Sequence, residues 1–144
     1  MSDPCEDISA AVATYLSDED SRGFGYGFQA TVPTNPSLEL YADHEGLRVL
    51  VVPIGETETK ETRGSVFVVP QVNVIVTSRS INGETRARLS GLVREMRNSL
   101  RFVKMAGWTW QGTETLSKFD AELLRKHQYL SAFQLSYQGL VTGL

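Results

Sequence analysis

Basic side chains gather on one side of the helix that the sequence predicts over residues 83–103. At about 100° per residue, five cations fall within an arc of about 80°, the basic arc: Arg86, Arg94, Arg97, Arg101 and Lys104. Guanidinium groups suit planar pairing at interfaces. Three roles stay open for the basic arc: a solvated face whose long stems shield apolar surface, a protein–protein contact, or a nucleic-acid contact.

Carboxylates gather in a second stretch, residues 55–64, where threonine alternates with charge. The acidic members are Glu56, Glu58 and Glu61. Alternation of this kind predicts an exposed hairpin or an extended loop that leads into the strand beginning near Val66.

Groups for nucleophilic catalysis are sparse. The two histidines, His44 and His127, lie in no recognisable motif, and no Gly-x-Ser-x-Gly elbow occurs. Cys5 lies in the first turn of a predicted helix, where the helix dipole lowers a thiol pKa, although a surface or packed terminus is the alternative. We therefore predict no catalytic residues and no enzyme; a deep pocket that holds a histidine beside carboxylates would reopen that case.

Metal and cofactor motifs are also missing from the sequence. The two dense acidic clusters, Asp18-Glu19-Asp20 and Asp43-His44-Glu45, have neither the glycine nor the distal glutamate of a calcium loop. The glycine-aromatic run from Gly23 to Phe28 has no clear strand before it and no helix after it, which a phosphate loop needs. We predict no metal and no cofactor.

Length and composition fit one domain over residues 1–144. The chain has 41% hydrophobic and 22% charged residues, one cysteine and a formal net charge of −3. This modest charge provides no overall field toward nucleic acid or an anionic membrane, and one cysteine excludes an internal disulfide. With no apolar h-region at the start and no run of about 18 apolar residues, we expect a soluble, unexported protein without a membrane span.

The first half of the chain predicts a helix and two long strands. Asp3 and Pro4 begin a helix that ends near Ser17, with an apolar stripe at spacings of three and four. Residues 47–54 are apolar on both faces apart from one arginine, which predicts a central strand. From Val66 the even positions are rich in valine, and Pro70 predicts an edge position or a bulge within that strand.

The second half predicts the long helix and two further strands. Residues 107–112 form a strand with Trp108 and Trp110 on one face, residues 113–117 a turn, and residues 129–138 a half-buried closing strand. The order of elements predicts an α+β fold: a mainly antiparallel sheet with an N-terminal helix and one long helix packed on one face.

A set of these features occurs together in one known family. It comprises the helix stripe Ile8-Val12-Tyr15, the strand Leu47 to Ile54, the step Thr62-Arg63 into a valine-rich strand, one long helix, a tryptophan-bearing strand and the closing Phe133-Gln134-Leu135-Ser136-Tyr137. From Ile8 to Tyr137 the chain resembles the tail-terminator, or tail-completion, proteins of long-tailed bacteriophages. The family has no catalytic residues to carry over.

The resemblance implies a structural virion protein that works in the tail or neck and is assembled in the host cytoplasm. Such a protein forms a ring, commonly a hexamer, on the last ring of the tail-tube protein, ends tube growth and offers a surface for the head-completion or neck protein. DNA passes through its channel without specific binding.

A ring with head-to-tail contacts needs two unlike patches, for which we expect the basic arc and the acidic segment Glu56-Glu58-Glu61. The acidic segment facing the channel, where like charge keeps DNA from sticking, is an alternative. Two other functions also stay open: another neck or head-tail joining protein, and a small cytoplasmic module that binds nucleic acid or an acidic protein partner through the basic helix.

Overall fold

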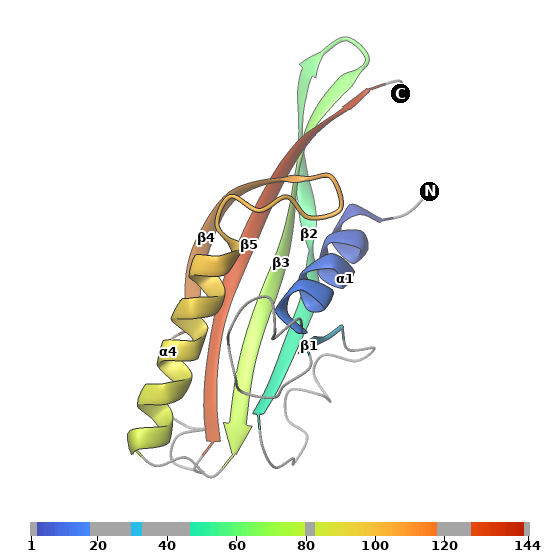
Figure 1. Cartoon of the computed structure of the whole chain (residues 1–144). Helices are drawn as coiled ribbons and strands as arrows, with labels where there is room; N and C mark the ends of the chain where they lie inside the picture. The colour runs from blue at the N-terminus through green and yellow to red at the C-terminus, as the bar shows by residue number, and fades with distance from the viewer. Residues whose placement is uncertain (1–2, 18–29, 33–46, 80–82, 118–127, 143–144) are drawn as a thin grey trace.

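The computed structural model describes residues 3–17, 30–32, 47–79, 83–117 and 128–142. Within these ranges the chain forms two helices and five strands (Figure 1): α1 (Pro4–Ser17), β1 (Ala30–Thr31), β2 (Leu47–Thr62), β3 (Ser65–Arg79), α4 (Gly83–Leu100), β4 (Thr109–Ser117) and β5 (Gln128–Thr142). The sheet order is β1-β2-β3-β5-β4, and only the β1–β2 pair is parallel. The predicted α+β class with a mainly antiparallel sheet is confirmed.

The helix α1 begins and ends where its sequence predicts. An Asp3 carboxylate oxygen accepts a hydrogen bond of 2.8 Å from the backbone N–H of Cys5, so Asp3 caps the first turn and Pro4 occupies the first helical position. The stripe of Ile8, Val12 and Leu16 is fully buried. Capping and periodicity are local features, which explains why the sequence alone located this helix.

A long hairpin replaces the short strand and the loop-or-hairpin segment that the sequence suggested. β2 continues to Thr62, turns at Arg63 and Gly64, and returns as β3, so the hairpin alternative is correct. Residues 49–52 are buried on both faces, as predicted, and β2 lies between β1 and β3. Within the described residues, however, β1 pairs with β2 only at Val49 and Leu50, so β2 is not the middle strand of the five. The central strand is β3.

Pro70 therefore lies in the middle of the sheet and not at an edge. The pairing of β3 with β5 breaks off between Val68 and Gln71 without a change of register, which accommodates the missing N–H of Pro70. The register shift lies in the partner strand β2, between Pro53 and Gly55. The residue skipped there, Ile54, forms a bulge that moves every later side chain of β2 to the other face of the sheet.

The second half departs from the prediction in two places. α4 ends at Leu100, and Phe102 follows in the left-handed region with φ of 62°, so the helix stops before the predicted Val103. The predicted turn over residues 113–117 is wrong, because β4 continues to Ser117 along β5.

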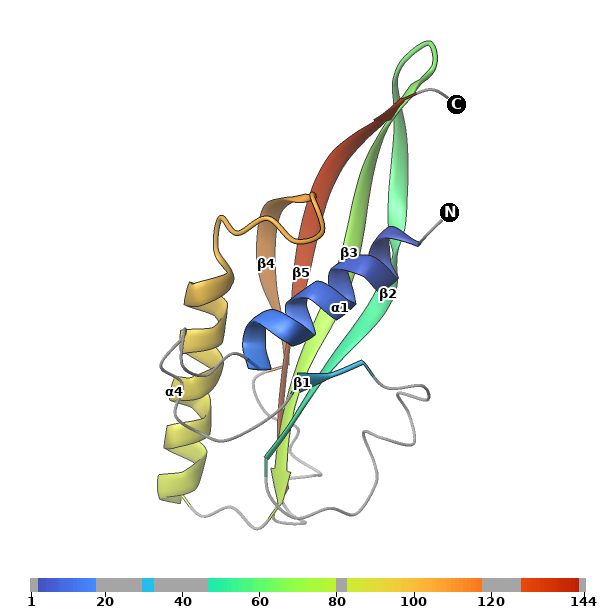
Figure 2. The ribbon, with the colours of Figure 1, turned by 45° about the vertical axis from the view of Figure 1, so that its right-hand side comes forward.

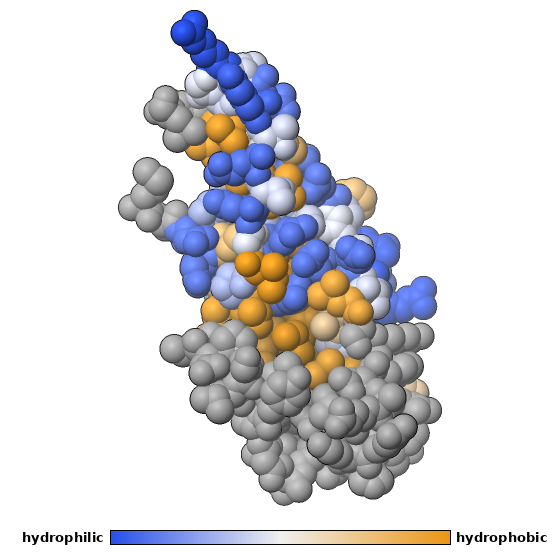
Figure 3. Space-filling model, turned by 180° about the vertical axis from the view of Figure 1, so that it is seen from behind, coloured by the Kyte–Doolittle hydropathy of each residue, from blue (hydrophilic) through white to orange (hydrophobic). Residues whose placement is uncertain are grey.

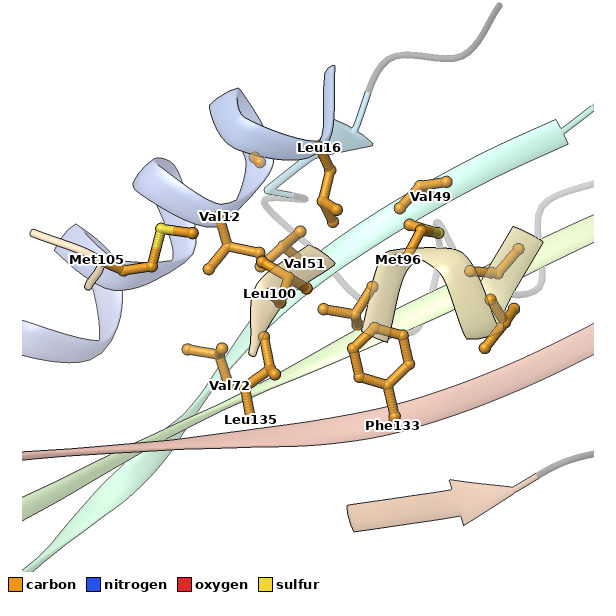
Figure 4. Packing of buried hydrophobic residues seen from close by; sticks show 14 of the residues in the cluster. Val12, Leu16, Val49, Val51, Val72, Met96, Leu100, Met105, Phe133 and Leu135 are labelled. Atoms are coloured by element: carbon orange, nitrogen blue, oxygen red, sulfur yellow. The ribbon is translucent and has the colours of Figure 1, made fainter. Parts of the chain in front are cut away.

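Both helices lie on the same face of the sheet, as predicted, and share one core with it (Figures 1 and 2). α1 covers β2 and β3, and α4 lies toward β5 and β4. Figure 4 shows part of this core, which includes Val12, Leu16, Val51, Val72, Met96, Leu100, Met105, Phe133 and Leu135. The Trp108 ring lies directly on Gly139, where an added Cβ would come within 2.7 Å of the indole.

The opposite face of the sheet has a different character (Figure 3). Hydrophilic side chains dominate the part near the hairpin tip, and apolar ones gather toward the other end. Across the middle, the Gln71 amide donates to Ser136 at 3.3 Å and the Gln134 amide donates to Asn73 at 3.2 Å. Neither helix in the described part of the chain is long and apolar enough to cross a membrane.

Candidate functional site

A half-open cavity of about 550 Å³ lies between α4 and the strands β4 and β5. Its helix wall carries Arg94, Arg97 and Arg101, and its strand side includes Thr115, Ser131 and Phe133. We call it the arginine groove. Among the described residues that line it, none is a carboxylate. The groove is thus positively charged and has hydroxyl groups within its lining.

The groove follows from the spacing of residues along α4. Leu92, Met96 and Leu100 point into the core and are fully buried, and the arginines lie on the flank of that stripe at steps of three and four. Since the apolar stripe faces the sheet, this flank faces the space above β4. Burial of one stripe therefore fixes the direction of three cationic side chains.

The three guanidinium groups have no ion-pair partner within the described part of the chain, and Nε of Arg97 is buried without any hydrogen-bond partner. A buried polar group left without a partner costs about 1–3 kcal/mol. Like charges on one flank of a helix also repel each other. A carboxylate or phosphate that enters the groove would relieve this repulsion, because its oxygens accept charge-assisted hydrogen bonds from the exposed guanidinium N–H groups of Arg94 and Arg101.

The structure brings together three of the five predicted cations. Lys104 lies beyond the end of α4, is exposed and does not line the groove, because the helix stops at Leu100. Arg86 belongs to α4, but its side chain lies outside those that the structure describes. Sequence reasoning missed Thr115 and Ser131; the alternation of β5 puts Ser131 on the face of Phe133, whereas Thr115 fell in the wrongly predicted turn.

The predicted acidic residues lie on a three-stranded arm. This arm comprises residues 55–62 of β2, 65–70 of β3 and 138–142 of β5, and it extends beyond both helices (Figures 1 and 2). Glu56 pairs with Pro70 and Glu58 with Val68, on the face that the helices cover lower in the sheet. Glu61 falls at the irregularity between Lys60 and Thr62, so it does not continue this row.

A third carboxylate joins Glu56 and Glu58 from α1. Cys5 Sγ donates to the carbonyl of Gly55 at 3.0 Å, which fixes the start of α1 against the root of the arm. The pKa of Glu56 is raised, first by partial burial and then by the negative charges of Asp3 and Glu58. We call Asp3, Glu56 and Glu58 the acidic patch. Asp3 was predicted only as a helix cap, since nothing local places it beside residue 56.

The residues considered for catalysis do not form a site in the described part of the chain. Cys5 is buried, and burial raises the pKa of its thiol, which opposes the activation that the helix start suggested. His44, His127, the two dense acidic clusters and the run Gly23 to Phe28 lie outside the described residues. Within the described ranges, no three His, Cys, Asp or Glu side chains group as metal ligands.

Comparison of the sequence with protein-family models and with curated proteins finds no match.

Proposed function

We propose that the chain is a ring-forming structural protein of a phage tail, a tail terminator that ends growth of the tail tube and provides a surface for head attachment. One observation supports this proposal most directly: two oppositely charged surfaces lie toward opposite edges of one sheet. The acidic patch lies beside β2, and the arginine groove lies beside β4. A subunit built in this way is suited to contact the next one head to tail.

Unlike surfaces on opposite edges cannot neutralise each other within one chain. When every copy uses both surfaces, each contact is heterologous, and the copies form a ring if the rotation from one to the next closes on itself. The resemblance to tail terminators favours a hexamer whose partners are the tail-tube protein and a head-completion or neck protein. Complementary charge also specifies the orientation of neighbouring subunits and suppresses like-to-like contacts.

The mass of the purified protein tests this function. Light scattering at several concentrations, with negative-stain images taken with and without isolated tail tubes, should give rings or a monomer that becomes a ring on tubes. A protein that stays monomeric and does not bind isolated tail tubes would contradict the proposal. If that monomer also bound DNA with steep salt dependence, the nucleic-acid module would replace the terminator.

A charge reversal locates the contact. Arg94→Glu should abolish rings, because it places a carboxylate in a groove that must receive carboxylates. Lys104→Glu is the matched control: it changes the net charge equally, on an exposed cation outside the groove. Equal sedimentation profiles for wild type and Arg94→Glu would count against the groove as the contact.

A further inference from the structure

We infer that neighbouring subunits join by strand pairing, with the β2 edge of one copy adding antiparallel to β4 of the next and the acidic patch entering the arginine groove. This inference rests on the ring-forming function proposed above and specifies its contact. The partner is a second copy of this chain. Three features of the sheet support the arrangement: open edges, strand directions and matching faces.

Both outer strands offer open edges within the described part of the chain. Among the residues that the structure describes, β1 pairs with β2 only at Val49 and Leu50, so β2 from Val51 to Thr62 has a described neighbour on one side only. β4 pairs with β5 over Thr109–Ser117 and with no other described strand. Unpaired N–H and C=O groups on such edges are templates for another strand.

The strand directions suit a repeated contact. β2, β3, β5 and β4 follow one another across the sheet, and each adjacent pair is antiparallel, so β2 and β4 run in opposite directions. A second copy that continues the sheet beyond β4, with its helices on the same side, presents its own β2 antiparallel to β4. No subunit needs to turn over, which is the condition for a head-to-tail ring.

The charged side chains then meet on one face. Glu56 and Glu58 lie on the helix side of β2. On β4, Thr113 and Thr115 lie on the same side, because they pair with Leu135 and Phe133, which are buried under the helices. The incoming carboxylates therefore enter the groove above this face. A shift of one residue would move them to the opposite face, so the charges also fix the register.

Exposed apolar side chains on the two edge strands add a second, independent indication. Ile54 of β2 and Leu116 of β4 are 50% and 46% exposed. Each lies at a register shift of its own strand, where the ladder toward the inner neighbour is irregular. Edge pairing covers both residues, whereas a contact confined to the two helices would leave them in water.

Disulfide cross-linking between copies tests which faces meet. In a Cys5→Ser background, which keeps a hydrogen-bond donor for the Gly55 carbonyl, Glu58→Cys is combined in turn with Thr113→Cys, Thr115→Cys and Glu114→Cys. The first two place both cysteines on the helix side, and the third places one on the opposite face, because Glu114 pairs with Gln134. Paired strands bring same-face residues within disulfide reach.

We expect cross-linked multimers to form at least tenfold faster for one of the two same-face pairs than for the Glu114 pair. Thr57→Cys with Glu114→Cys is the reciprocal control, since both lie on the face away from the helices, and it should also cross-link. Glu58→Cys also occurs in the same-face pairs, and Glu114→Cys also occurs in the reciprocal control. A folding defect from either substitution would therefore slow those cross-links as well, and it cannot explain slow cross-linking of the Glu58 and Glu114 pair alone.

The outcomes separate the two proposals. Strand pairing would be overturned if rings form but same-face and opposite-face pairs cross-link equally fast, or if no pair cross-links. Either result would leave the ring-forming function intact. Absence of rings for wild type and all variants, with and without tail tubes, would overturn the function itself. Recovery of rings when Glu58→Arg is combined with Arg94→Glu would place the two charges in one contact.

Discussion

The two helices cover one sheet in different ways. Along their central stripes they are alike: Ile8 and Leu16 of α1 and Leu92 and Met96 of α4 are all fully buried. They differ beside the stripe. α1 has the uncharged residues Ser9, Ala11, Ala13 and Tyr15 there, whereas α4 has three arginines and leaves a cavity of about 550 Å³. The charge of the flanking residues decides whether a helix closes onto a sheet or leaves a groove.

Three hydrogen bonds stabilise the α1 region. The α1 region holds its cap at Asp3, the thiol bond from Cys5 to Gly55 and a hydrogen bond of 2.8 Å from the Tyr15 hydroxyl to the carbonyl of Ser99. The groove side of α4 has a buried, unpartnered Nε on Arg97. On α1, Ser9 Oγ is likewise buried without a hydrogen-bond partner among the described residues. The two helices therefore differ in charge rather than in unsatisfied polar groups: the α4 flank presents exposed guanidinium groups to the groove, which an anion can contact.

Truncation of one residue on each side should give the largest difference between the two regions. Leu16→Ala should lower the free energy of unfolding by about 2–5 kcal/mol, because it leaves a cavity in the core. Arg94→Ala should change it by no more than about 0.5 kcal/mol, as is usual for exposed positions. Urea unfolding followed by tryptophan fluorescence measures both. If Arg94→Ala lowers the free energy of unfolding by more than about 2 kcal/mol, Arg94 stabilises the folded subunit itself and is not available only for a partner.

Two tyrosines, Tyr15 and Tyr137, test the packing between α1, α4 and the sheet. The Tyr137 hydroxyl is buried without a partner, and its pKa is raised by burial and then by the nearby Tyr15. Tyr137→Phe should therefore stabilise the protein by about 1 kcal/mol, since it removes an unsatisfied group. Tyr15→Phe is the matched control and should destabilise by about 0.5–1.5 kcal/mol, because it removes the bond to Ser99. Thermal melts that give both changes the same sign would contradict this account.

The smallest expected effect concerns the pH dependence of the acidic patch. The pKa of Glu56 is higher in the folded than in the unfolded subunit, so its protonated form favours folding. This contribution is present below the unfolded pKa and is lost as pH rises through the folded pKa. Glu56→Gln should remove that loss, which amounts to a few tenths of a kcal/mol at an exposed site.

Melting temperatures of dilute, monomeric samples at pH 4 and pH 7 measure the effect. The melting temperature of Glu56→Gln relative to wild type at the same pH should be higher at pH 7 than at pH 4. The same substitution should weaken ring formation, because in the proposed contact the Glu56 carboxylate enters the arginine groove of the next subunit. If Glu56→Gln is less stable than wild type at pH 7, the expected stability effect is wrong. If it also assembles normally, Glu56 does not contribute to the subunit contact.

Local signals account for the parts of the fold that the sequence predicted. The cap at Asp3, the alternating valines of β3 and the three-and-four spacing of α4 each depend on neighbours within a few residues. They gave α1, most of β3 and β5, and the α+β class. The errors lie where distant partners decide: the bulge at Ile54, the break at Pro70 and the extension of β4 through residues 113–117 are set by pairing with other strands.

The candidate site also combines features set by local sequence with features set by tertiary contacts. The row of arginines on α4 and the acidic segment around Glu56 and Glu58 can be read from the sequence, because each depends on residues close together in the chain. Three further features follow from tertiary contacts: Lys104 lies outside the row, Asp3 joins the acidic patch, and groove and patch lie toward opposite edges of one sheet. Periodicity gives the direction of a side chain along its own element. Strand order and register give what that side chain faces, and they arise only when distant segments pair.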